Sequence, residues 1–138
     1  MRLDRIDKMS DVMRAMFDKE FRAISVILAE ESSLRNKLHQ LEVQINQNRD
    51  VCQNDLKLQA VGAQLLWQGW TTRTHRQLNT ELAQVLARKL VSMDRVRLAF
   101  GRQQAVEMMQ LTERQMLRKK RATLQNQALM ALEQAGKH

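Results

Sequence analysis

The chain has 138 residues with no proline, no tyrosine and only four glycines. Because proline and glycine supply most turns, this composition excludes turn-rich sandwiches, barrels and alternating βα folds. The hydrophobic fraction of 43% and the charged fraction of 28% also exclude general disorder. Abundant Met, Leu, Gln, Arg and Ala favour helices. The 4% of aromatic residues predicts a thin core.

The net charge of +8 is unevenly distributed along the chain. Residues 1–69 hold ten basic and ten acidic side chains, whereas residues 70–138 hold thirteen basic and five acidic ones. A basic second half predicts an acidic partner, which could be nucleic acid, anionic lipid or a protein surface. The alternative is a solvated face that only keeps the protein soluble.

Features of secreted and membrane-spanning proteins are missing from the sequence. Cys52 is the single cysteine, so an intrachain disulfide is excluded. Residues 1–8 lack the apolar core of a signal peptide, and the longest apolar stretch, residues 23–29, is too short to cross a bilayer. We expect a cytoplasmic protein, peripheral to a membrane at most, for example at the cytoplasmic face of the inner membrane.

A heptad ladder in the first half predicts a helix over about residues 3–60. Steps of three and four residues define the narrow stripe of a left-handed coiled coil. Eleven of the seventeen ladder positions are apolar, and the polar ones include Glu20, Glu31, Asn48 and Asp55, which favour a fixed register at modest stability. The ladder is Leu3, Ile6, Ser10, Met13, Phe17, Glu20, Ile24, Ile27, Glu31, Leu34, Leu38, Leu41, Ile45, Asn48, Cys52, Asp55 and Gln59.

Two of the four glycines, Gly62 and Gly69, fall near the midpoint and predict a turn region over about residues 61–70. A second helix follows over about residues 71–135, in which Gly101 is tolerated and Gly136 is a stop. The expected stripe is Leu78, Leu82, Leu86, Met93, Val96 and Phe100, with Val85 and Ala99 beside it, then Val106, Met109, Met116, Leu117, Leu124, Leu129 and Leu132. We therefore predict an all-α fold: one domain over residues 1–138, in which two equal helices form an antiparallel coiled-coil hairpin with its termini together.

The sequence predicts no enzyme. His39, His75 and His138 have no partner at metal-ligand spacing, and the glycines do not form a phosphate-binding loop. Cys52 lies on the ladder, where a packing thiol is expected rather than a nucleophile. We expect no catalytic residue, metal, cofactor or small-molecule substrate.

Three features are candidates for partner binding. Trp67 and Trp70 lie three residues apart, so they either cap the end of the core or form an exposed anchor for another protein. The nine methionines fit either ordinary core filling, which we expect, or an adaptable surface. The third feature is a basic collar around the helix, formed by Arg118, Lys119, Lys120 and Arg121.

Several segments resemble the FliJ/YscO family of type III secretion stalk and chaperone-escort proteins, including those of flagellar export. They are Trp67, the Arg/Gln-rich run at residues 75–79, and the aromatic, basic and apolar run at residues 100–109. The resemblance covers nearly the whole chain in architecture, because both have two helices, a central break and a basic second helix. The spacing between the two runs is about one heptad longer than usual in that family.

The resemblance implies a rod similar to the central stalk of a rotary ATPase. It implies insertion of the paired termini into a hexameric export ATPase, with the basic collar near the ring. It also implies contact with the cytoplasmic domain of the export gate and binding of export chaperones. The matching exposed candidates for the gate contact are Arg73, Arg76, Asn79 and Glu81.

Two other functions remain open from the sequence. The basic second half is compatible with a nucleic-acid-binding helical protein, although the chain has few aromatics for stacking and no helix-turn-helix spacing. The ladder of the first helix is compatible with a coiled-coil scaffold that dimerises. Salt-dependent DNA binding would support the first alternative, and a dimeric mass would support the second.

Overall fold

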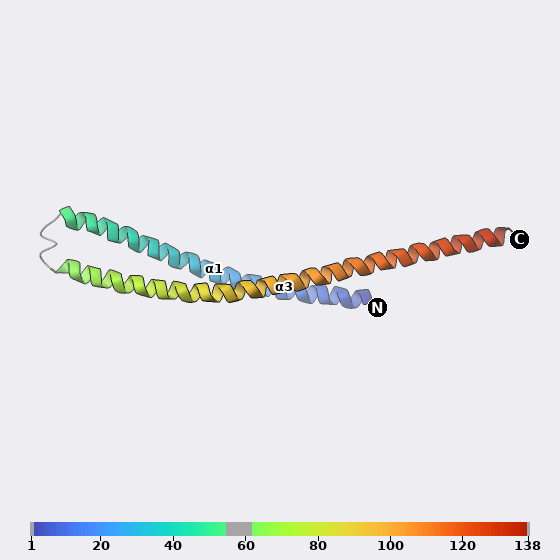
Figure 1. The fold of residues 1–138 in the computed structure, drawn as a ribbon, viewed down its shortest axis with the longest axis horizontal. Helices are drawn as coiled ribbons and strands as arrows, with labels where there is room; N and C mark the ends of the chain where they lie inside the picture. Colours follow the sequence, from blue (N-terminus) through green and yellow to red (C-terminus); the bar gives the residue numbers. More distant parts are fainter. Residues whose placement is uncertain (1, 55–61, 138) are drawn as a thin grey trace. The chain divides into compact units, whose positions relative to one another are not determined.

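The computed structural model describes residues 2–54 and 62–137, without the side chains of residues 52–54. These residues form two helices, α1 over Arg2–Asn54 and α3 over Ala63–Gly136 (Figure 1). The described chain is all-helical, and its two helices pack against each other as a helical hairpin. The expected continuation of the first helix over residues 55–60 lies outside the described residues.

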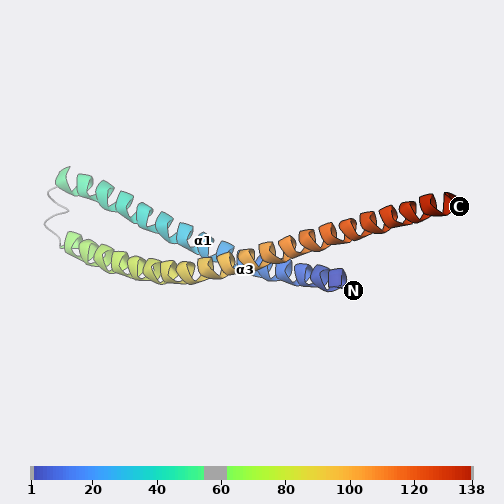
Figure 2. The same ribbon diagram turned by 45° about the vertical axis from the view of Figure 1, so that its right-hand side comes forward.

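Contacts divide the chain into two compact units. Unit 1 comprises Met1–Glu20 and Val96–His138, and unit 2 comprises Phe21–Arg95. In unit 2, the light-blue to green part of α1 lies alongside the green to yellow part of α3 (Figure 2). The helices contact each other in both units: Arg2 lies 3.9 Å from Glu113 and Arg14 lies 3.9 Å from Glu107 in unit 1, and Arg88 lies 2.8 Å from Glu30 in unit 2.

The ladder predicted for the first helix is confirmed over α1. Every ladder position from Leu3 to Asn48 is buried or half-buried, whereas almost every other described residue of α1 is exposed. The buried members are Ile6, Ser10, Ile24, Glu31, Leu34 and Leu41. The last three ladder positions, 52, 55 and 59, lie outside what the structure describes. A single stripe spaced by three and four residues therefore supplies all of the packing surface of α1.

The stripe predicted for the second helix is wrong by about one position. The buried residues of α3 are Thr71, Val85, Ser92, Ala99 and Val106. Val106 was predicted in the stripe, but Val85 and Ala99 were placed beside it, and Thr71 and Ser92 were not included. Six large residues were predicted to begin the stripe. Phe100 is exposed, and the other five are half-buried: Leu78, Leu82, Leu86, Met93 and Val96. Because α1 contributes large Ile and Leu side chains, α3 presents small and β-branched ones, and the two stripes together fill the narrow interface.

The predicted turn region is too long, because residues 63–70 are helical in α3. Gly62 has a positive φ of 70°, which glycine adopts without steric cost, and its carbonyl accepts a hydrogen bond from the Leu66 amide at 3.3 Å. Gly69 lies in the helix interior, where it costs about 1 kcal/mol relative to alanine. The neighbouring leucines and glutamines are strong helix formers, so they start α3 directly after Gly62.

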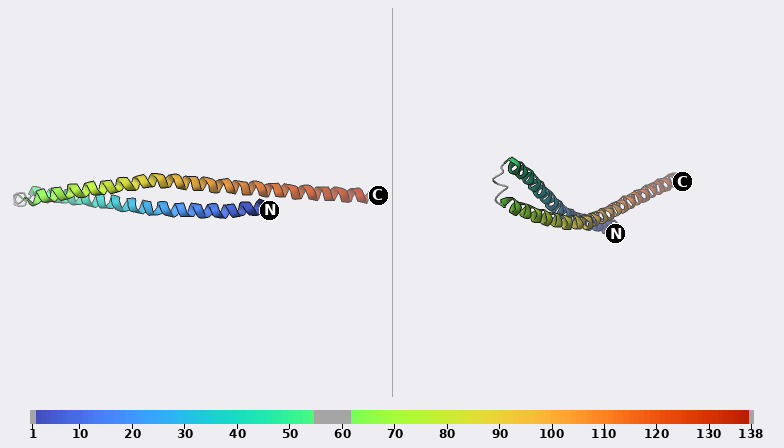
Figure 3. Two further views of the ribbon diagram at one scale, coloured as in Figure 1. Left: turned by 90° about the horizontal axis from the view of Figure 1, so that it is seen from below. Right: turned by 60° about the vertical axis from the view of Figure 1, so that its left-hand side comes forward.

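The helices are not equal, and the prediction that they are is wrong. α1 has 53 residues and α3 has 74. In unit 1, α3 continues well past the N terminus of α1, so the termini are not paired (Figure 3). The helix runs through Gly101 and ends at Gly136, as predicted. Leu124, Leu129 and Leu132 were expected in the stripe but are 60–70% exposed, because the described part of α1 does not reach them.

The stability of the hairpin should depend on the ladder rather than on leucine content. Leu41 is 4% exposed, whereas Leu90 is 69% exposed. We expect Leu41→Ala to lower the free energy of unfolding by about 2–3 kcal/mol, because it removes buried methyl groups and leaves a cavity. Leu90→Ala is the matched control and should change it by less than about 0.5 kcal/mol. Urea denaturation followed by circular dichroism measures both, and equal losses would contradict the assigned interface.

Candidate partner-binding surfaces

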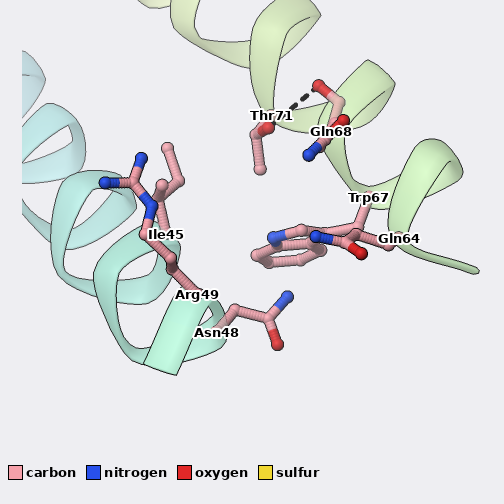
Figure 4. Close-up of a pocket in the computed structure, with 7 residues that line it drawn as sticks. All are labelled: Ile45, Asn48, Arg49, Gln64, Trp67, Gln68 and Thr71. Atoms are coloured by element: carbon pink, nitrogen blue, oxygen red, sulfur yellow. Dashed lines mark hydrogen bonds between the residues drawn. The ribbon is translucent and has the colours of Figure 1, made fainter. Parts of the chain in front are cut away.

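The two tryptophans lie at the start of α3 in unit 2 and have different environments. Trp67 is half-buried and points toward α1, where Ile45, Asn48 and Arg49 line a cavity of about 110 Å³ (Figure 4). Trp70 stacks on Trp67, with ring centroids 5.2 Å apart and an interplanar angle of 27°. It remains 45% exposed. Trp67 therefore caps the packed interface, and Trp70 extends the same aromatic surface toward solvent.

The four residues proposed to contact an export gate do not form one stripe. Arg73, Arg76 and Asn79 are exposed on α3 in unit 2, whereas Glu81 is half-buried beside α1. Arg73 Nε donates to the Gly69 carbonyl at 3.2 Å, so its side chain lies along its own helix. Arg76 and Asn79 remain exposed to a partner, although Asn79 Nδ2 also lies 3.1 Å from Nδ1 of His75 on its own helix.

A charged cluster crosses the interface of unit 2 at Glu31. The residue is buried, and its carboxylate lies 2.9 Å from Lys89 Nζ and accepts hydrogen bonds from Arg35 at 3.0 and 3.1 Å. The hydrogen bond from Lys89 lowers the pKa of Glu31 below its ordinary value, Arg35 adds to this, and burial opposes it. Next to it, Arg88 pairs with Glu30 at 2.8 Å. These bonds connect fixed positions on the two helices, so they favour one register.

On one side of unit 1, polar and charged side chains of α1 lie close to those of α3. Gln110 Nε2 donates to Asp7 Oδ1 at 2.7 Å, and Arg114 lies 3.9 Å from the same oxygen. Arg14 lies 3.9 Å from Glu107 on the same side. These charged side chains therefore lie near a partner on the other helix. At 3.9 Å, each exposed ion pair contributes little to stability.

The basic collar lies on the part of α3 that extends beyond α1. Glu113, near the end of the paired region, lies 3.9 Å from Arg2, and Leu117 is half-buried. Every described residue from 118 to 137 is exposed. We call residues 118–136 the extension, and at 1.5 Å per residue it is about 28 Å long. It carries the four Lys/Arg residues of the collar and a single acid, Glu133, and Lys137 follows it.

The extension also leaves apolar side chains without a described partner. Leu124, Ala128, Ala131 and Ala135 follow Leu117 at helical spacing, so they continue the face with which α3 packs on α1. Leu124 is 64% exposed. An apolar stripe of this kind beside a basic collar is typical of a surface that binds another protein.

The prediction that the methionines mainly fill the core is wrong. Of those that the structure describes, only Met13 and Met93 are half-buried, and the rest are exposed. The exposed ones are Met9, Met16, Met108, Met109, Met116 and Met130. Their positions lie off the ladder of α1 and off the small-residue stripe of α3.

No family profile, curated protein or solved structure matches this chain. Within residues 2–54 and 62–137, no three His, Cys, Asp or Glu side chains gather where they could hold a metal ion. Over the same residues, neither helix has a segment that is both long and apolar enough to cross a bilayer.

The Glu31 cluster should make the hairpin sensitive to acid. The folded-state pKa of Glu31 lies below 4.5, so its ionised form stabilises the fold above that pH, and this contribution is lost as the pH falls through the lowered value. We expect Glu31→Gln to reduce the drop in unfolding temperature between neutral pH and pH 4 or below. Glu42→Gln, an exposed carboxylate on the same helix, is the control and should retain the full drop.

Substituting each tryptophan should show how much unfolding free energy comes from the half-buried Trp67 and how much from the exposed Trp70. We expect Trp67→Ala to cost about 2 kcal/mol of unfolding free energy, because it removes the cap on the interface. Trp70→Ala should cost about 1 kcal/mol, which is the value of the ring stack. Urea denaturation measures both, and a larger loss for Trp70→Ala would contradict this geometry.

Proposed function

We propose that this chain is a non-catalytic coiled-coil component of a flagellar or related type III protein export apparatus, and that it engages a hexameric export ATPase. The packing of α1 on α3 is proposed to be an antiparallel coiled coil. The resemblance to the FliJ/YscO family at residues 67, 75–79 and 100–109 supports this assignment. A location in the cytoplasm or at the cytoplasmic face of the inner membrane follows from the same proposal.

The single observation that carries the proposal is the unpaired extension of α3. A stalk that enters a ring needs a helical end whose side chains are free to contact the surrounding subunits. Residues 118–136 provide this end, because all are exposed and the four-residue basic collar is presented around the helix. A collar can meet several subunits of a ring at once, whereas a stripe would meet one.

The packing of the helices supports a mechanical role. In unit 2, Arg88 pairs with Glu30 and Lys89 with Glu31, and these contacts tie α3 to α1 at a fixed register. A stiff, asymmetric hairpin inside a symmetric ring contacts different subunits differently and biases their conformational states. In this proposal, Arg76 and Asn79 of α3 are the first residues to test for contact with the export gate.

The proposal is tested with the hexameric export ATPase of the same organism. We expect co-elution at low salt and a changed ATPase rate when the chain is added. Replacing Arg118, Lys119, Lys120 and Arg121 with alanine should weaken binding about tenfold or more, because each exposed ion pair contributes about 0.2–1 kcal/mol and 1.4 kcal/mol is tenfold. The loss should be largest at low ionic strength.

The matched control removes the same number of exposed cations elsewhere. Its four alanine substitutions replace Lys8, Arg22, Lys37 and Arg95, which lie outside the extension. This variant should bind the ATPase as the unmodified chain does. Absence of co-elution and of any rate change at low salt would overturn the proposal, and equal losses in both variants would show that net charge, not the collar, drives binding.

A further inference from the structure

The exposed methionines of unit 1 gather on one side of the helix pair. On α1, Met9, Val12 and Met16 follow one another at steps of three and four residues, and on α3 Met109 and Met116 lie seven residues apart, so each set shares one face. Their exposures of 43–54% leave about half of each side chain in solvent. We call these five residues the methionine face.

A groove between the two helices lies beside the α3 half of this face. Its volume is about 230 Å³. Seven residues line it: Arg2, Ile6, Met108, Met109, Thr112, Glu113 and Met116. Met9 lies one turn from Ile6 on α1, so the apolar surface continues from the groove along that helix. The surface is therefore concave at one end and flanked by long, flexible thioether side chains.

The border of the methionine face is basic. On α1, Arg5 and Lys19 lie at helical spacing from Met9 and Met16, and on α3, Arg102 and Lys120 lie at such spacing from Met109 and Met116. All four basic side chains are exposed. Glu113, the acid that lines the groove, is half-buried and lies 3.9 Å from Arg2.

The opposite side of unit 1 has a different chemistry. There Asp7, Arg14, Glu107 and Arg114 approach one another across the helices, so positive and negative charges are balanced. The positive border is thus confined to the side that also exposes methionines. Methionine side chains are polarizable and adopt many rotamers, which suits a surface that packs on a partner helix.

We propose that the methionine face is a docking site for an amphipathic helix of a partner protein whose apolar stripe is flanked by acidic residues. The thioethers and the groove would receive the apolar side chains, as in other helix-in-groove complexes. The basic border would pair with the flanking acids and set the orientation. The five residues of the methionine face lie outside the extension, although Lys120 of the border belongs to it, and the proposal does not depend on engagement of an export ATPase.

The test uses a dye-labelled peptide of about five helical turns with leucines at steps of three and four residues and glutamates beside them. A second peptide carries lysines in place of the glutamates. By fluorescence anisotropy, we expect the glutamate peptide to bind at least tenfold more tightly than the lysine peptide. The double variant Met109→Gln/Met116→Gln should weaken binding about tenfold. Its matched control, Leu90→Gln/Leu111→Gln, changes exposed residues outside the face and should bind as the unmodified chain does.

A readout without substitutions guards against misfolded variants. In the unmodified chain labelled with ¹³C-methyl methionine, the resonances of Met9, Met16, Met109 and Met116 should shift on adding the glutamate peptide, and that of Met93 in unit 2 should not. Unmoved resonances at the methionine face, or equal binding of the two peptides, would overturn the proposal. A dimer that the double variant dissociates would also overturn it, because the occupant would then be a second copy of this chain.

Discussion

The rest of the structure depends on how the stripe of α1 fits the stripe of α3. The buried side chains are mostly Ile and Leu on α1, and small or β-branched on α3. Ile6, Ile24, Leu34 and Leu41 are buried on one helix, and Thr71, Val85, Ser92, Ala99 and Val106 on the other. Small residues let the helices approach closely, and close packing makes each buried leucine or isoleucine effective. With so narrow an interface, most other side chains face solvent and are free for charge pairing or for partners.

The sequence predicted α1 well, because most positions of its ladder at steps of three and four carry large apolar residues. It predicted α3 poorly, because the buried residues of that helix are not its most hydrophobic ones. The centre of the α3 stripe is occupied by Thr71, Ser92 and Ala99, which carry little hydrophobic signal, while exposed residues such as Leu98 and Phe100 carry much. Which apolar face is buried is decided by the shape of the opposite helix, and a single helix does not contain that information.

The candidate sites were also predictable from the sequence only in part. The basic collar was visible as a run of four cations, and the structure places it in an exposed part of the helix. Its lack of a described partner depends on the lengths of both helices, which the turn glycines did not reveal. The methionine face was missed because Met109 and Met116 fit a helical stripe equally well when they are buried and when they are exposed. Only the position of α1 distinguishes the two cases.

The extension shows how pairing and binding are connected in this chain. An isolated helix of its length is marginal in water, because the first turn is costly to form. Here α3 is already nucleated by packing on α1, so residues 118–136 need only propagate it, and their Ala, Leu, Gln, Lys and Arg residues do so readily. A partner that covers Leu124 and its neighbours would therefore bury apolar surface without ordering a coil first. The paired hairpin thus lowers the entropic cost of binding at a segment that it does not itself contact.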